Sequence, residues 1–125
     1  MMRPPHHDET LLLVEDEPLT ALFLADALEA EGYRVNCCGT GFDALNYIDM
    51  EDSITAIVTD IRLELGPDGW EIARRAREQF PDAQVIYITG HAEAEFGEEK
   101  VPESVILRKP FKSAELVKAI TAMLN

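Results

Sequence analysis

The chain has little positive charge and no long apolar run. Only 11 of its 125 residues are Lys or Arg, against 24 Asp or Glu, so the formal net charge is −13 at pH 7. Nucleic acids and anionic membrane surfaces are bound through clustered basic residues, so this balance argues against both as direct partners. A membrane-spanning helix needs about 18 or more consecutive apolar residues, and the sequence has no such run. These absences leave a globular protein that we expect in the cytoplasm.

Cysteine is scarce as well, and the two cysteines are neighbours. Cys37 and Cys38 end the run RVNCC, where adjacent strand residues point to opposite faces. We interpret them as small residues in a reducing cytoplasm, not as a disulfide or a metal site. The leader MMRPPHHDE lacks the apolar core of a secretory signal. We expect residues 1–9 to form a flexible N-terminal arm and residues 10–125 to form one domain, because this length supports a single core.

Short apolar, β-branched runs alternate with helical patterns along the chain. The runs that indicate buried parallel strands are residues 11–14, 35–38, 54–59, 85–89 and 105–107. Capping residues precede three of the helical patterns: Thr40, Asp68 and Ser113. The alternation predicts an α/β fold with a doubly wound parallel sheet. Residues 90–104 have few apolar anchors, so any helix there should be short and loosely held.

Polar side chains follow four of these runs immediately. Glu15 and Asp16 end the first run, and Asp60, Thr89 and Lys109 end or follow three later ones. In a parallel sheet these strand ends share one edge, where such folds bind ligands. Carboxylates suit Mg²⁺ or Mn²⁺, while a hydroxyl and an ammonium group can bind phosphoryl oxygens. The set predicts a cation and phosphoryl-transfer site, with Asp60 as the nucleophile because its strand reads as central.

The chain resembles the receiver domain of two-component response regulators over roughly residues 10–125. The motifs that carry this resemblance are LLLVEDEP with Glu15 and Asp16, the strand-end Asp60, DGWEIAR, YITG with Thr89, and KPF from Lys109. The resemblance implies a flavodoxin-like fold, with five parallel strands in the order 2-1-3-4-5 and helices on both faces.

The resemblance also implies a mechanism. Asp60 would accept a phosphoryl group in an Mg²⁺-dependent reaction from a phosphohistidine on a histidine kinase or a histidine phosphotransfer protein. Four groups would bind the metal: the carboxylates of Glu15, Asp16 and Asp60, and the backbone carbonyl of Arg62. The Lys109–Pro110 bond would be cis. Such a protein is not an ordinary enzyme, because it catalyses only its own phosphorylation and dephosphorylation. Its output would pass through protein–protein contact with a downstream target, the protein itself being a monomer or a weak dimer.

Three features depart from the family pattern. Ile106 stands three residues before Lys109, where receivers carry a Tyr or Phe whose ring rotation couples to movement of the threonine. The interval from Thr89 to Lys109 is short for the family, and the loop after Asp60 is slightly long. Without a ring switch, we expect phosphorylation to act by ordering residues 90–104.

Other residues admit two interpretations. Arg62 and His91 follow Asp60 and Thr89 by two positions, where family members tune hydrolysis of the phosphoryl group, although solvated loop side chains would look the same. On the first helix, the helical spacing predicts a core stripe of Leu24, Ala27 and Leu28. The same spacing places Leu19 and Leu22 on the opposite side, beside the acidic site, either as ordinary exposed leucines or as contacts for a phosphodonor.

Three alternative functions remain. A haloacid-dehalogenase-type phosphohydrolase also uses a strand-end Asp, but it would place a second Asp where this chain has Arg62. A flavin or nucleotide binder would carry a glycine-rich phosphate loop, which the turns lack. A phosphorylation-independent scaffold would not need all five polar residues of the site.

Overall fold

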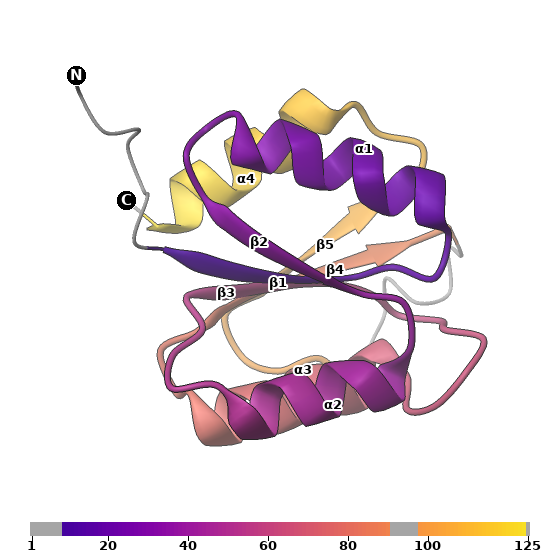
Figure 1. The fold of residues 1–125 in the computed structure, drawn as a ribbon, viewed down its shortest axis with the longest axis vertical. Coiled ribbons are helices and arrows are strands. Elements are labelled where there is room, and N and C mark those ends of the chain that lie inside the picture. The colour runs from indigo at the N-terminus through magenta and orange to yellow at the C-terminus, as the bar shows by residue number, and fades with distance from the viewer. Residues whose placement is uncertain (1–8, 91–97, 125) are drawn as a thin grey trace.

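The computed structural model describes residues 9–90 and 98–124. Over these residues the chain forms three layers, with α1 and α4 on one face of a five-stranded parallel sheet and α2 and α3 on the other (Figure 1). The strand order is β2-β1-β3-β4-β5, which confirms the predicted arrangement. In chain order the elements are β1 (Thr10–Val14), α1 (Pro18–Glu29), β2 (Arg34–Cys38), α2 (Gly41–Met50), β3 (Ala56–Asp60), α3 (Gly69–Gln79), β4 (Gln84–Thr89), β5 (Ser104–Arg108) and α4 (Ser113–Leu124).

Side-chain caps mark the starts of three helices, and at the start of α1 Glu17 Oε1 accepts a hydrogen bond from Leu19 N at 3.2 Å. Thr40 Oγ1 accepts a hydrogen bond from Asp43 N at 3.1 Å at the start of α2. Asp68 Oδ1 accepts from Glu71 N at 3.0 Å at the start of α3. The predicted cap at Ser113 is wrong by one position, because Ser113 is already the first residue of α4. Each cap satisfies a backbone N–H that the helix leaves unpaired, so it sets where the loop from the sheet edge ends.

The core divides into two layers because alternate strand residues face opposite sides of the sheet. On β1, Leu11 and Leu13 pack with α1 and α4, whereas Leu12 and Val14 pack with α2 and α3. All five residues of β3 are buried, in agreement with its central position. The expectation of a buried strand at residues 35–38 is wrong, because β2 is an edge strand whose side chains are mostly exposed or half-buried.

The helix α1 buries a slightly different stripe from the predicted one. Leu24 and Leu28 are buried as expected, but Ala25 takes the place of Ala27, which is only half-buried. The face of α1 turned away from the sheet keeps three large apolar side chains exposed: Leu19, Leu22 and Phe23. The sequence pattern predicted the first two, and Phe23 extends the same surface.

The return segment, defined here as residues 98–103, leads into β5 and contains turns but no helix. It is held more firmly than its sequence indicates. Val101 is buried, and Arg77 Nη1 of α3 donates to Pro102 O at 2.8 Å. Residues 91–97, the remainder of the predicted irregular stretch, lie outside the described residues. After β5, the Lys109–Pro110 bond is cis, as the resemblance implied.

Candidate functional site

The carboxyl ends of β1, β3, β4 and β5 meet at one edge of the sheet. Backbone hydrogen bonds of 2.7–3.1 Å continue the strand pairing past these ends: Glu15 N donates to Cys38 O, Ile61 N to Ile88 O, and Lys109 N to Thr89 O. The backbone of these residues is therefore tied to the neighbouring strand end, which positions their side chains along this edge.

Three carboxylates gather at this edge. Oxygen atoms of Glu15, Asp16 and Asp60 lie within 4.8 Å of one another. Glu15 and Asp60 are buried, with 4% and 5% of their surfaces exposed, while Asp16 is half-buried. Like charges this close repel one another, and burial removes the water that would screen them. The cluster therefore requires positive charge.

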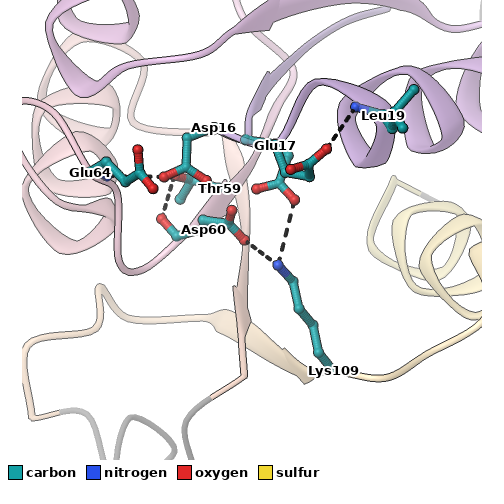
Figure 2. Close-up of polar contacts among 8 residues, drawn as sticks. Asp16, Glu17, Leu19, Thr59, Asp60, Glu64 and Lys109 are labelled. Carbon is teal, nitrogen blue, oxygen red and sulfur yellow. Dashed lines mark hydrogen bonds and ion pairs between the residues drawn. The ribbon is translucent and has the colours of Figure 1, made fainter.

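Part of that positive charge comes from Lys109. Its Nζ lies 3.3 Å from Asp60 Oδ1 and 3.5 Å from Glu15 Oε1 (Figure 2). The lysine side chain is 40% exposed, so it reaches the buried carboxylates from the solvent side. One ammonium group thus faces two carboxylates, which leaves the cluster with a net negative charge.

The environment of Asp60 favours its neutral form. Burial raises the pKa of the Asp60 carboxyl above its ordinary value, and the charge and hydrogen bond of Lys109 oppose that rise. A carboxylate that water solvates poorly is a better nucleophile than one on the surface, provided that a cation keeps it ionised. Positive charge beside Asp60 is thus needed both for the stability of the site and for its chemistry.

The loop between β3 and α3 orients Asp16. Glu64 N donates to Asp16 Oδ2 at 3.0 Å, as Figure 2 shows. At the end of the loop, Gly69 packs so tightly on β3 that a Cβ atom there would lie 2.2 Å from Asp60 O. The contact between Glu64 N and Asp16 has no signature in the sequence. A backbone N–H is present in almost every residue, so no side-chain pattern could have indicated it.

The geometry fits a hard divalent cation. Glu15 Oε2 is buried and has no hydrogen-bond partner among the described residues. A buried carboxylate oxygen without a partner is unfavourable unless something else satisfies it. Mg²⁺ and Mn²⁺ prefer oxygen ligands, and Glu15, Asp16 and Asp60 offer them within a small volume. The role of the Arg62 carbonyl stays a prediction.

A pocket of about 170 Å³ opens beside the carboxylates and is lined by Asp16, Asp60, Arg62, Ile88, Thr89, Gly90 and Lys109. The structure thus brings Thr89 and Lys109 to the same pocket as Asp60, as the strand-end pattern predicted. Arg62 is exposed at this pocket. Ile106 is half-buried and packs in a separate apolar cluster with Trp70. His91 lies outside the described residues.

This combination of a five-stranded parallel sheet, an acidic cluster and a strand-end lysine defines a class of phospho-acceptor domain. The chain matches the family described as the response regulator receiver domain over residues 11–121. It belongs to the receiver domains of two-component response regulators. Within the described residues, no helix has the length and apolar character needed to cross a membrane.

Relatives of known sequence include both short and long proteins. The chain is 36% identical over 116 residues to the response regulator receiver protein CpdR of Brucella abortus, and the match covers 91% of this chain and 95% of CpdR. It is 30% identical over 119 residues to the sensor kinase CckA of the same organism, covering 93% of this chain but only 12% of CckA. The chain therefore corresponds to one part of the longer kinase.

Solved structures give the same result. A response regulator receiver protein from Sinorhizobium medicae superposes with a TM-score of 0.88 at 40% identity, covering 94% of each chain. The response regulator TrrA of Thermotoga maritima, in complex with Mg²⁺ and BeF, superposes with a TM-score of 0.83 at 25% identity, covering 93% of this chain and 99% of that one. The chain is thus a signalling domain by family, and not a member of a classical enzyme family.

Proposed function

We propose that Asp60 accepts a phosphoryl group from a phosphohistidine on a histidine kinase or a histidine phosphotransfer protein, with Mg²⁺ or Mn²⁺ bound by Glu15, Asp16, Asp60 and the Arg62 carbonyl. The observation that carries this proposal is the position of Lys109 Nζ, 3.3 Å from Asp60 Oδ1 within a group of three carboxylates. That arrangement offers a nucleophile and places positive charge where phosphoryl oxygens would lie.

The reaction is a displacement at phosphorus. A carboxylate oxygen of Asp60 attacks, the P–N bond to the donor imidazole breaks, and the bonding electrons remain on the imidazole nitrogen. Lys109 and the Thr89 hydroxyl each bind a phosphoryl oxygen, so the negative charge that Asp60 meets is reduced. The divalent cation, when bound, neutralises the carboxylates and phosphoryl oxygens together.

The signal ends by hydrolysis. Water attacks the phosphorus of the acyl phosphate, the P–O bond to Asp60 breaks, and inorganic phosphate leaves. Arg62, which lines the pocket, modulates this step. The place of His91 in the sequence, two residues after Thr89, gives it a modulating role as well. The domain thus catalyses only its own phosphorylation and dephosphorylation.

The phosphodonor docks on an apolar surface of α1 next to the pocket. We define this docking surface as Leu19, Leu22 and Phe23, which are 75%, 59% and 63% exposed. A groove of about 260 Å³ adjoins it and is lined by Thr20, Phe23, Leu24, Lys109, Pro110 and Phe111. The groove shares Lys109 with the acceptor site, so a helix bound there would carry its histidine close to Asp60.

The remaining features of the proposal concern the whole protein. Residues 10–125 act as the receiver domain in the cytoplasm, as a monomer or a weak dimer. The output is contact with a downstream protein, and Ile106 excludes the ring switch that the family uses. A haloacid-dehalogenase-type phosphohydrolase is not proposed, because Arg62 stands where such an enzyme needs an acid.

Phosphorylation in vitro tests the proposal. The protein is incubated with Mg²⁺ and acetyl phosphate, or with a phosphorylated kinase, and the modified residue is mapped by mass spectrometry. We expect modification at Asp60 alone, none in Asp60→Asn, and normal modification in Asp26→Asn, which changes an exposed acid on α1. Normal modification of Asp60→Asn would contradict the proposal by placing the acceptor elsewhere, and no modification of the wild-type protein would favour a scaffold that does not depend on phosphorylation.

A further inference from the structure

Tyr87 is a large buried side chain that the phosphorylation chemistry does not use. It lies in the middle of β4 and has no exposed surface. Its ring packs against that of Trp70 with 4.7 Å between the ring centroids, and Ile106 packs on the same cluster. A ring enclosed in this way has one position available, so it cannot swing between buried and exposed states.

The hydroxyl of Tyr87 connects β4 to the return segment. It accepts a hydrogen bond from Val101 N at 3.0 Å, and both residues are buried. Two further hydrogen bonds join the segment to α3 and to the first residue of β5. Arg77 Nη1 of α3 donates to Pro102 O at 2.8 Å, and Ser104 Oγ donates to Val101 O at 2.7 Å. The Tyr87 bond is thus a direct link from the segment to the strand that ends in the phosphorylation site.

Tyr87 and the site share that strand. Thr89 follows Tyr87 by two residues, so both side chains project from the same face of β4. Thr89 lines the pocket beside Asp60, and its carbonyl oxygen accepts from Lys109 N at 2.7 Å. A displacement of the end of β4 toward a phosphoryl group would therefore move both Thr89 and the Tyr87 ring.

Because β5 lacks the aromatic residue of the family's ring switch, the signal has to pass through another contact. Ile106 is the direct partner of Tyr87 across β4 and β5. The aromatic ring of this pair is therefore that of Tyr87 on β4, and it is enclosed. In the receiver family the rotating ring is instead on β5, at the position of Ile106. Signal transfer in this chain needs a contact that is fixed to β4 and reaches the segment beyond it, and the Tyr87 hydroxyl meets both conditions.

We propose that Tyr87 is a positioning residue that couples phosphorylation of Asp60 to the return segment through its hydrogen bond with Val101 N. When a phosphoryl oxygen draws Thr89 inward, β4 carries the Tyr87 hydroxyl with it, and the bond to Val101 becomes shorter and longer-lived. The segment then exposes a more ordered surface to a partner. This inference rests on the proposed function of Asp60 and deepens it by naming the output route.

Amide exchange measured by NMR on the full chain tests the coupling. Beryllofluoride with Mg²⁺ serves as the phosphoryl mimic. In the wild-type protein we expect the Val101 amide to exchange roughly tenfold more slowly once the mimic binds, because its existing hydrogen bond to Tyr87 opens less often. In Tyr87→Phe, which keeps the ring, Val101 should exchange faster from the start and the slowing should disappear. Tyr33→Phe is the matched control, because Tyr33 is a buried tyrosine in the cluster on the other face of the sheet.

Fluorescence provides a second readout that a merely structural role would leave unchanged. Trp70 is the only tryptophan in the chain and touches the Tyr87 ring. Its emission should change on addition of the mimic in the wild-type protein and in Tyr33→Phe, and much less in Tyr87→Phe. Equal changes in all three proteins, with equal slowing at Val101, would overturn the inference.

The experiments distinguish failure of the proposed phosphorylation of Asp60 from failure of the coupling through Tyr87. If Asp60 takes up neither phosphate nor the mimic, the proposed function fails. If Asp60 is modified normally in wild type and in Tyr87→Phe but Val101 does not respond in the wild-type protein, only the coupling fails. Normal phosphorylation of Tyr87→Phe, together with loss of the Val101 response, supports both.

Discussion

The ammonium group of Lys109 lies 3.3 Å from the carboxylate of Asp60. The same group is 3.5 Å from Glu15, so one partly exposed cation faces two buried anions. Lys109 thus favours the ionised form of the Asp60 carboxyl, whose pKa is raised by burial. Removing the Asp60 carboxylate and removing the Lys109 ammonium group should therefore change the stability of the metal-free protein in opposite directions.

Asp60→Asn should stabilise the metal-free protein at neutral pH. Burial raises the folded-state pKa of Asp60, so the folded protein resists ionisation of this group. The resulting penalty is absent below the unfolded-state pKa, near 3.8, and grows as the pH rises through the folded-state pKa. We expect the variant to be more stable than the wild-type protein at pH 7 and to gain almost nothing in acid, because burial penalises only the ionised carboxyl. Urea unfolding in EDTA at several pH values measures this.

The control for that experiment is Asp26→Asn, which removes the same charge from an exposed position on α1. Equal stabilisation of both variants would show that only the net charge of the chain matters. A loss of stability in Asp60→Asn at pH 7 would contradict the prediction.

Lys109→Met should destabilise the metal-free protein. The change leaves the buried carboxylates of Asp60 and Glu15 without their nearby cation. Because the lysine side chain is 40% exposed and water screens the pair, we expect a loss of only about 1 kcal/mol at neutral pH. The loss should shrink when Mg²⁺ is added, since the ion supplies the missing charge. Lys118→Met, an exposed lysine on α4, should show neither effect in the same unfolding assay.

Mg²⁺ should raise the Tm of the wild-type protein by relieving repulsion among Glu15, Asp16 and Asp60. An ion that binds only the folded state stabilises it by roughly 2.7 kcal/mol at a hundredfold excess over Kd. Asp16→Ala should abolish most of this rise, while Asp26→Ala should leave it intact. Thermal unfolding across an Mg²⁺ titration measures the difference, and an equal rise in Asp16→Ala would place the ion elsewhere.

Phe23→Ser should impair phosphorylation by a kinase without impairing phosphorylation by acetyl phosphate. Phe23 is 63% exposed and borders the groove that contains Lys109, so its loss affects docking and leaves the acceptor untouched. We expect KM for the phosphodonor protein to rise roughly tenfold, the effect of one interface side chain worth about 1–2 kcal/mol. The rate with acetyl phosphate should stay the same.

Met50→Ser is the matched control for Phe23, because Met50 is an exposed apolar residue, 83% exposed, at the end of α2. If both variants slow phosphotransfer from the kinase equally, the docking surface on α1 has no special role. If Phe23→Ser also slows the reaction with acetyl phosphate, the side chain affects the acceptor site itself.

The alternation of strands and helices along the chain could be predicted because it depends on local patterns, whereas the order of the strands in the sheet came from the family resemblance. Thr40 and Asp68 cap their helices as expected, since a cap acts on backbone groups only three residues away. Asp60, Thr89 and Lys109 could be assigned to one site because parallel strands must end at the same edge of the sheet. For these residues, knowledge of the fold class was sufficient.

The tertiary structure decided how exposed each element is and which contacts form between distant segments. The run ending at Cys38 is as apolar as a buried strand, yet β2 lies at the edge, where only one neighbour covers it. The Glu64 amide on Asp16 and the Val101 amide on Tyr87 are backbone groups, which have no signature in the sequence. Residues 98–103 contain few apolar side chains, but α3 and β4 hold them through polar contacts from outside the segment. The sequence by itself determined the helices, the strands and the polar residues at the strand ends, because these depend on local composition. Long-range packing determined the contacts between distant segments, because the atoms in those contacts meet only in the folded chain.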